Sequence, residues 1–333
     1  MSDKRNALID AARLAAAAGI ILSHVDLSGC GAAGTLFGQF LSVRVSLMFF
    51  LAVIGYYVEK SCQTGENPIF RRVCSLFRLY GVWSLVYLAL SFVMVVLVQG
   101  VPLGQFLISK VKSFFFSGSY YHLWFYPAAI YGLLFIGGTK KLLGHRAHAF
   151  LMPLALLLYG AGILGTGYLP LGMQLPGLSR LYAADFFEPI MHICCLGFPS
   201  LVFGMAAARK SAGRSTAVLL AAAAVYGAES VVLCLFLRWQ ENPQMLMSTP
   251  LLTVLFLQWC QSRSLPLGRE KLSLFRTVSA GMYHVHPLFL AVFAIVLPGL
   301  RGLWSFLLCV ICSAVFGSLL HYLKKYKLFA LFC

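Results

Sequence analysis

Charged residues are scarce in this sequence, and acidic residues are the scarcest of them. Only 11% of the chain is charged, with 10 Asp or Glu against 26 Lys or Arg. Soluble domains carry about 25% charged residues, so this composition excludes an ordinary soluble protein. Hydrophobic residues make up 60% instead, and apolar runs such as 80–98 and 302–323 can cross a hydrocarbon core about 30 Å thick. The sequence therefore predicts an all-α, polytopic membrane protein.

Signals that would process or divide the chain are also absent. No small-residue cleavage site follows the apolar stretch 11–22, so we expect an uncleaved N-terminus. No repeat, low-complexity segment or linker separates parts of the chain, which predicts one transmembrane domain over residues 1–333. Six of the cysteines lie in predicted spans, where a thiol behaves as a small hydrophobe, and the pair Cys309 and Cys312 has no second pair nearby. We expect neither a disulfide framework nor a bound metal.

Basic residues are distributed unevenly between the two sides of the predicted membrane domain. With a cytoplasmic N-terminus, 20 Lys and Arg fall on the inner side and 5 on the outer side, while Arg44 lies within a span. The positive-inside rule accounts for this split and predicts that both termini are cytoplasmic. The net charge of +16 is then a topology signal, and nucleic acid is not an expected partner. The ten expected spans are 8–26, 39–58, 79–98, 122–138, 148–166, 187–207, 215–237, 245–261, 278–298 and 302–322.

The first span carries polar residues at both of its ends. In RLAAAAGIILSH, Arg13 and His24 are eleven positions apart, so on a helix they share one face and lie roughly 16 Å from each other. Asp10 is one turn before Arg13. Taken singly, Arg13 fits a snorkelling anchor and His24 fits a histidine bonded to a neighbouring helix. Their shared face makes both candidates for one functional site.

Two later segments add histidines to this list. His122 opens the fourth span within YHLWF, where Trp124 fits an interfacial aromatic belt but the histidine does not. In YHVHP, Tyr283 precedes His284 and His286, which are two positions apart. On a helix these histidines face different sides and are poor joint metal ligands. Pro287 frees a carbonyl one turn earlier, which suits a broken helix that lines a polar cavity.

Other charged residues have both a structural and a functional interpretation. Glu229 lies deep in a span, and Arg44 is an available counter-charge for it. Arg71, Arg72 and Arg78 follow the second span, where they serve either as topology charges or as a binding site for a phosphate-rich cytosolic ligand.

These motifs resemble the acyltransferase 3 family, whose members are multi-span membrane enzymes that acylate carbohydrates and other envelope molecules. The matching features, in order, are the Arg-x10-His pair, FFLAVIGYY (49–57), the arginines of the first inner loop, HLWF (122–125) and YHVHP (283–287). The segments 117–135 and 228–257 are similar to one branch, the membrane domain of serine racemases associated with vancomycin resistance. That branch carries a soluble racemase domain after the last span; we expect none here, because the sequence stops soon after it. The sequence departs from the family's pattern at two positions: Ile54 replaces the serine of a Ser-Gly-Tyr motif, and Ser75 replaces the first arginine of an Arg-x-x-Arg motif.

The resemblance implies an acyl-CoA donor on the cytosolic side of a bacterial cytoplasmic membrane, with an acetyl group as the expected acyl group. The implied acceptor is an extracytoplasmic carbohydrate, peptidoglycan or an amino-acid-like molecule. Arg13 and the three loop arginines would hold the phosphates of the donor, and His24 would be the general base. His122 and His286 would orient the acceptor or stabilise the oxyanion, with Asp10, Arg44, Trp124, Glu229 and Tyr283 in support. Two other interpretations stay open: a transporter for a small amino acid such as serine, and a structural or regulatory membrane protein.

Overall fold

Every regular element in the computed structural model is helical. The structure describes residues 6–182, 184, 186–209, 215–239, 244–263 and 265–332, and no strand occurs among them. The all-α prediction is therefore confirmed. Four of the basic residues used as topology signals, Lys4, Arg5, Lys210 and Arg214, lie outside the described residues. The longer α-helices are α1 (Ala7–Ser23), α3 (Val43–Gln63), α4 (Ile69–Ser91), α5 (Leu103–Phe116), α6 (Phe125–Leu143), α7 (Ala147–Leu164), α11 (Phe198–Arg209), α12 (Thr216–Val231), α13 (Thr249–Gln261), α14 (Arg269–Val296) and α15 (Gly302–Leu323).

Seven segments of the described chain are long and apolar enough to cross a membrane. One of them, Phe125–Leu164, contains both α6 and α7, which a turn at Gly144–Arg146 separates. Two of the predicted spans correspond to shorter helices, because α1 has 17 residues and α13 has 13. A helical membrane protein is thus confirmed, while the number of ten spans and the sidedness of the termini stay predictions.

Several of these segments contain π-helical turns, in which one extra residue widens the helix. They are η2 (Leu36–Ser42), η3 (Phe92–Val98), η5 (Met191–Gly197) and η6 (Val232–Phe236). Wide turns of this kind occur often at functional sites, because they weaken the regular hydrogen bonds of a helix.

The first helix begins at a well-defined cap. The Asn6 side chain accepts hydrogen bonds from the backbone N–H groups of Leu8 and Ile9, which have no partner within the helix. Its amide nitrogen also donates to the backbone carbonyls of Cys260 and Arg263, so the cap ties α1 to the end of α13. Seventeen residues later α1 ends at Ser23, and His24 takes the C-terminal capping position with a φ of −101°. His24 therefore lies at the very end of the helix that carries Arg13.

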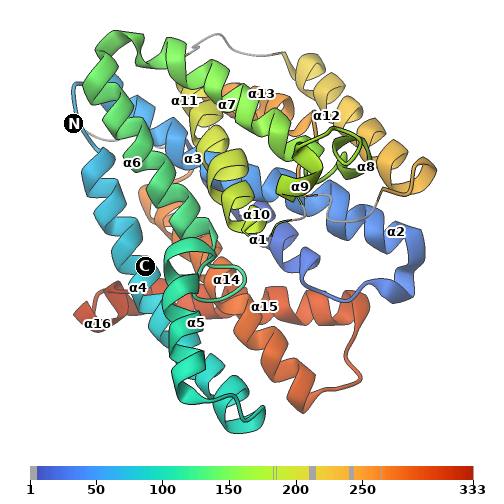
Figure 1. Cartoon of the computed structure of the whole chain (residues 1–333). Coiled ribbons are helices and arrows are strands. Elements are labelled where there is room, and N and C mark those ends of the chain that lie inside the picture. The colour runs from blue at the N-terminus through green and yellow to red at the C-terminus, as the bar shows by residue number, and fades with distance from the viewer. Residues whose placement is uncertain are drawn as a thin grey trace.

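Close helix contacts hold the bundle together around α1 (Figure 1). Helix α1 packs against α14 and α3, α3 packs against α11, and α14 lies side by side with α15. The crossing of α3 and α11 uses glycine on both helices: a Cβ at Gly55 would lie 2.0 Å from the Leu201 carbonyl oxygen, and one at Gly204 1.8 Å from that of Ala52. Small residues allow this approach, since helices in lipid gain stability from close packing of their backbones.

Candidate active site

Three histidines from distant parts of the chain meet at the end of α1. The ring of His24 stacks on that of His286, from α14, with centroids 5.2 Å apart. The ring of His122, from the loop before α6, meets His286 edge to face at 5.4 Å. Tyr121 contacts His24 with a centroid distance of 5.0 Å. The structure thus brings together His24, His122 and His286, the three histidines for which the family resemblance implies a catalytic role, and we call this group the histidine cluster.

The ring nitrogens of this cluster are poorly satisfied. His286 is fully buried, and its Nδ1 contacts the Met282 carbonyl at 3.1 Å, but its buried Nε2 has no hydrogen-bond partner in the described part of the chain. His122 is 3% exposed, and both of its ring nitrogens are buried without a partner there. Each unmade hydrogen bond at a buried polar group costs about 1–3 kcal/mol. Such costs at neighbouring groups are typical of a site that a ligand completes.

Tyr283 holds the cluster in place. Its hydroxyl donates a hydrogen bond to the backbone carbonyl of His122, which ties the loop before α6 to α14. Helix α14 continues through Pro287 to Val296, so the expectation of a helix broken at this proline is wrong. Neighbouring helices in a bundle can compensate for the hydrogen bond that an internal proline removes.

His284 faces away from the cluster, as the two-residue spacing predicts. Its ring stacks on Trp83 at 4.8 Å, its Nδ1 contacts the Ala280 carbonyl at 2.6 Å, and its Nε2 contacts the Tyr126 hydroxyl. Both ring nitrogens therefore have partners within the fold. His284 is a packed structural histidine.

At the N-terminal end of α1, the carboxylate of Asp10 lies close to two arginines. Its buried carboxylate lies 2.8 Å from Nη1 of Arg276, on α14, and 3.8 Å from Nη1 of Arg13. Asp10 thus contacts Arg13, one turn away on the same helix, and also Arg276, which the sequence motifs do not single out. A signal was available: Arg276 is two turns before Tyr283, so one face of α14 carries both. Helices α1 and α14 run parallel, with the arginines at one end and the histidines at the other.

The loop arginines do not act as one group. Arg71 and Arg78 are exposed on α4, and Arg71 pairs with Glu66 at 3.1 Å. Arg72 is half-buried, and both it and Arg13 interact electrostatically with the buried hydroxyl of Tyr126. Of the three arginines on α4, Arg72 is therefore the one that shares an interaction partner with Arg13.

The remaining supporting residues are placed differently from the sequence expectations. In the described part of the chain no ion pair joins Arg44 to Glu229, so the suggested pairing is wrong. Glu229 accepts hydrogen bonds from the Tyr168 hydroxyl at 2.7 Å and from the backbone and hydroxyl of Ser248. Trp124 is buried and stacks on His192 at 4.1 Å, so it does not belong to an interfacial belt.

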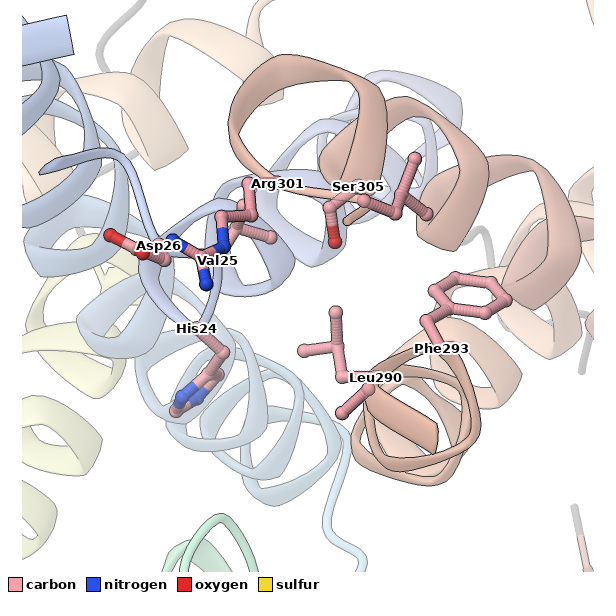
Figure 2. A pocket seen from close by; sticks show the side chains of 9 residues that line it. His24, Val25, Asp26, Leu290, Phe293, Arg301 and Ser305 are labelled. Carbon is pink, nitrogen blue, oxygen red and sulfur yellow. The ribbon is translucent and has the colours of Figure 1, made fainter. Parts of the chain in front are cut away.

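A small pocket opens beside the histidine cluster. Its volume is about 200 Å³, and its wall includes His24, Asp26, Arg301 and Ser305 as well as apolar side chains (Figure 2). His24 is exposed to this space. Among the described residues, no three His, Cys, Asp or Glu side chains are grouped so that they could hold a metal ion.

Fold and site together define a class: a polytopic helical membrane protein with a histidine cluster at one end of its first helix and arginines at the other. Residues 6–323 match the family model described as an acyltransferase domain, and the chain belongs to this acyltransferase 3 family.

Two curated relatives are both described as racemases. An amino-acid racemase of Enterococcus faecalis is 26% identical over 85% of this chain and 41% of its own length. A serine/alanine racemase of Enterococcus gallinarum is 27% identical over 55% of this chain and 26% of its own. The chain thus spans well under half the length of these relatives. No solved structure matches it.

Proposed function

We propose that the protein transfers an acyl group, expected to be acetyl, from cytosolic acyl-CoA to a hydroxyl of an acceptor on the outer side of the membrane. The observation that supports this most is the histidine cluster, in which the exposed His24 stacks on His286, and buried ring nitrogens of His122 and His286 have no partner among the described residues. An imidazole titrates near neutral pH, so it can take up and return a proton during one reaction cycle.

In the proposed reaction His24 takes the proton of the acceptor hydroxyl, and the hydroxyl oxygen attacks the thioester carbonyl. The new C–O bond forms as the C–S bond breaks, and the proton returns to the thiolate, which leaves as CoA–SH. His286, which stacks on His24, and His122, which contacts His286, would donate hydrogen bonds to the carbonyl oxygen as it gains charge.

The donor would be bound from the end that carries the arginines. Arg13 and Arg72 both interact electrostatically with Tyr126. Asp10, which forms an ion pair with Arg276, also lies 3.8 Å from Arg13 and would orient it. Guanidinium groups bind phosphates in bidentate geometry. The length of α1 between Arg13 and His24, roughly 16 Å, is comparable to that of an extended pantetheine arm.

The test uses acetyl-CoA alone, because water can replace an unknown acceptor. We expect purified wild-type protein to hydrolyse acetyl-CoA slowly, and His24→Gln to lower this rate about 10²- to 10⁴-fold while acetyl-CoA still binds. Gln keeps a hydrogen bond but cannot accept and return the proton. His145→Gln, at an exposed histidine in the turn after α6, is the matched control and should behave as wild type. Normal hydrolysis by a His24→Gln protein as heat-stable as wild type would exclude the proposed base.

Transport of a small amino acid is the second candidate. Two observations favour it: the π-helical turns that interrupt several apolar segments, and the similarity to a protein described as a serine/alanine racemase. Uptake of radiolabelled serine into proteoliposomes, in the absence of acyl-CoA, distinguishes it from the enzyme.

A further inference from the structure

The pocket beside His24 is small and has two chemically different walls. Leu290 and Phe293, both on α14, form an apolar wall, while Asp26, Arg301 and Ser305 lie on the opposite, polar side (Figure 2). A cavity of 150 Å³ holds a benzene molecule. A volume of about 200 Å³ therefore admits only a small part of an acceptor, on the order of seven heavy atoms.

Arg301 gives the polar wall a positive charge. It is the N-terminal capping residue of α15, its side chain is exposed, and it makes no ion pair or hydrogen bond within the described residues. The N-terminus of a helix favours anions, because its first N–H groups have no partner within the helix. Ser305, in the first turn of α15, faces the same space. Arginine is disfavoured on the predicted outer side, yet this one lies beside the proposed base.

A second guanidinium lies near His24 from the interior. Arg44, on α3, is half-buried and interacts electrostatically with His24, and its buried Nε has no hydrogen-bond partner in the described part of the chain. The ring of His286, whose buried Nε2 has no partner among the described residues, stacks on His24. The surroundings of His24 therefore contain two positive charges and one negative charge, that of Asp26.

We propose that the acceptor is an anionic hydroxyl compound, whose carboxylate or phosphate binds Arg301 while its hydroxyl reaches His24. This inference rests on the proposed function and specifies its acceptor. Leu290 and Phe293 would contact the carbon atoms between the two groups. The negative charge of Asp26 repels such a ligand. Removing the charge of Arg301 should therefore weaken anion binding, whereas removing the charge of Asp26 should strengthen it.

Binding is measured by calorimetric titration of the purified protein with three probes that share a three-carbon hydroxyl skeleton: glycerate, glycerol 3-phosphate and glycerol. We expect at least one anion to bind at least tenfold more tightly than neutral glycerol, and the better anion distinguishes carboxylate from phosphate. Arg301→Gln should weaken anion binding about tenfold, because it removes a charge-assisted hydrogen bond. Asp26→Asn should strengthen it about two- to fivefold, because it removes a repulsion.

Arg180→Gln is the matched control, since Arg180 is another exposed arginine on the predicted outer side and does not line the pocket. It should bind as wild type. Equal binding of glycerol and the anions, or anion binding by Arg301→Gln at wild-type strength, would overturn the inference. Weaker binding in Asp26→Asn would overturn it in favour of a zwitterionic acceptor.

The acetyl-CoA hydrolysis assay separates this inference from the proposed function, because it needs no acceptor. Hydrolysis that depends on His24, without selective anion binding, would leave the acyltransferase in place and reject the anionic acceptor. Selective anion binding that depends on Arg301, without hydrolysis or transfer, would support the anion site and reject the acyltransferase.

Discussion

The two ends of the bundle differ in whether their buried polar groups have partners. At the end of Arg13, buried carboxylates form ion pairs: Asp10 pairs through Oδ2 with Arg276, although its Oδ1 makes no hydrogen bond among the described residues. Glu59, on α3, pairs with Lys140 at 2.7 Å, His148 at 3.2 Å and Arg209 at 3.6 Å. We call the group around Glu59 the Glu59 cluster. At the end of His24, the buried ring nitrogens of His122 and His286 are left without partners within the described residues.

This contrast separates structure from function. Removing one member of a buried group of paired charges destabilises the fold, because it leaves the other charges uncompensated. A buried polar group without a partner lowers stability and persists only where something else requires it. The Glu59 cluster connects α3, α6, α7 and α11. In the histidine cluster, by contrast, buried ring nitrogens have no hydrogen-bond partner among the described residues and can bind a ligand.

The largest effect on stability is expected in the Glu59 cluster. Glu59→Gln should lower the free energy of unfolding by about 3 kcal/mol, the lower end of the range for a buried pair because Lys140 and Arg209 are partly exposed. Glu66→Gln removes the exposed pair with Arg71 and should stay within about 1 kcal/mol of wild type. Denaturant unfolding in detergent measures both, and equal stability of the two variants would contradict the contrast.

The crossing of α3 and α11 tests whether the two ends depend on a common scaffold. Gly204→Ala places a methyl group against the Ala52 carbonyl, which overpacks the crossing and should cost about 1–3 kcal/mol of stability. Gly227→Ala, on α12, has open space around the new Cβ and should be neutral or stabilising by about 0.5–1 kcal/mol. Thermal melting of both variants checks the prediction. A Gly204→Ala protein as stable as wild type would show that the crossing adjusts at little cost.

Acetyl-CoA binding tests the function of the arginines at the end of the bundle that contains Arg13. Arg13→Ala and Arg72→Ala should each weaken acetyl-CoA binding about tenfold, since each loses a charge-assisted phosphate contact, and Arg13→Lys should recover only part of it. Arg78→Ala, at an exposed position on the same helix as Arg72, should change the affinity less than twofold. The affinities follow from titration of the purified variants. An unchanged affinity in Arg13→Ala would return Arg13 to the role of a membrane anchor.

The smallest change in stability is expected in the histidine cluster. His122→Phe keeps the ring but removes two unpartnered nitrogens, so unfolding should stay within about 1 kcal/mol of wild type while acetyl-CoA hydrolysis falls tenfold or more. His284→Phe loses hydrogen bonds at both ring nitrogens and should be less stable by about 1–3 kcal/mol. Measuring stability and hydrolysis in parallel separates the two histidines. Normal hydrolysis in His122→Phe would remove that histidine from the site.

Local sequence patterns determined the fold class of this protein and the helix faces on which its polar residues lie. Scarce charge and long apolar runs define a helical membrane protein, because backbone polar groups in lipid must be satisfied within the helix. The spacing of Arg13 and His24 places them on one face of α1, and the spacing of His284 and His286 places them on different faces of α14. These statements need only the 3.6-residue period, which acts over a few turns of one chain segment.

Tertiary structure alone decided which of these residues meet. His24 and His286 are 262 positions apart, and Asp10 and Arg276 are 266 apart, so no local pattern could indicate that α1 and α14 run parallel and pair at both ends. The same limit explains why the suggested pairing of Arg44 with Glu229 is wrong. Both residues carry charge within spans, but packing places Tyr168 and Ser248 beside Glu229. Helix faces follow from sequence spacing, but helix neighbours follow from the close packing of glycines and side chains across the whole bundle.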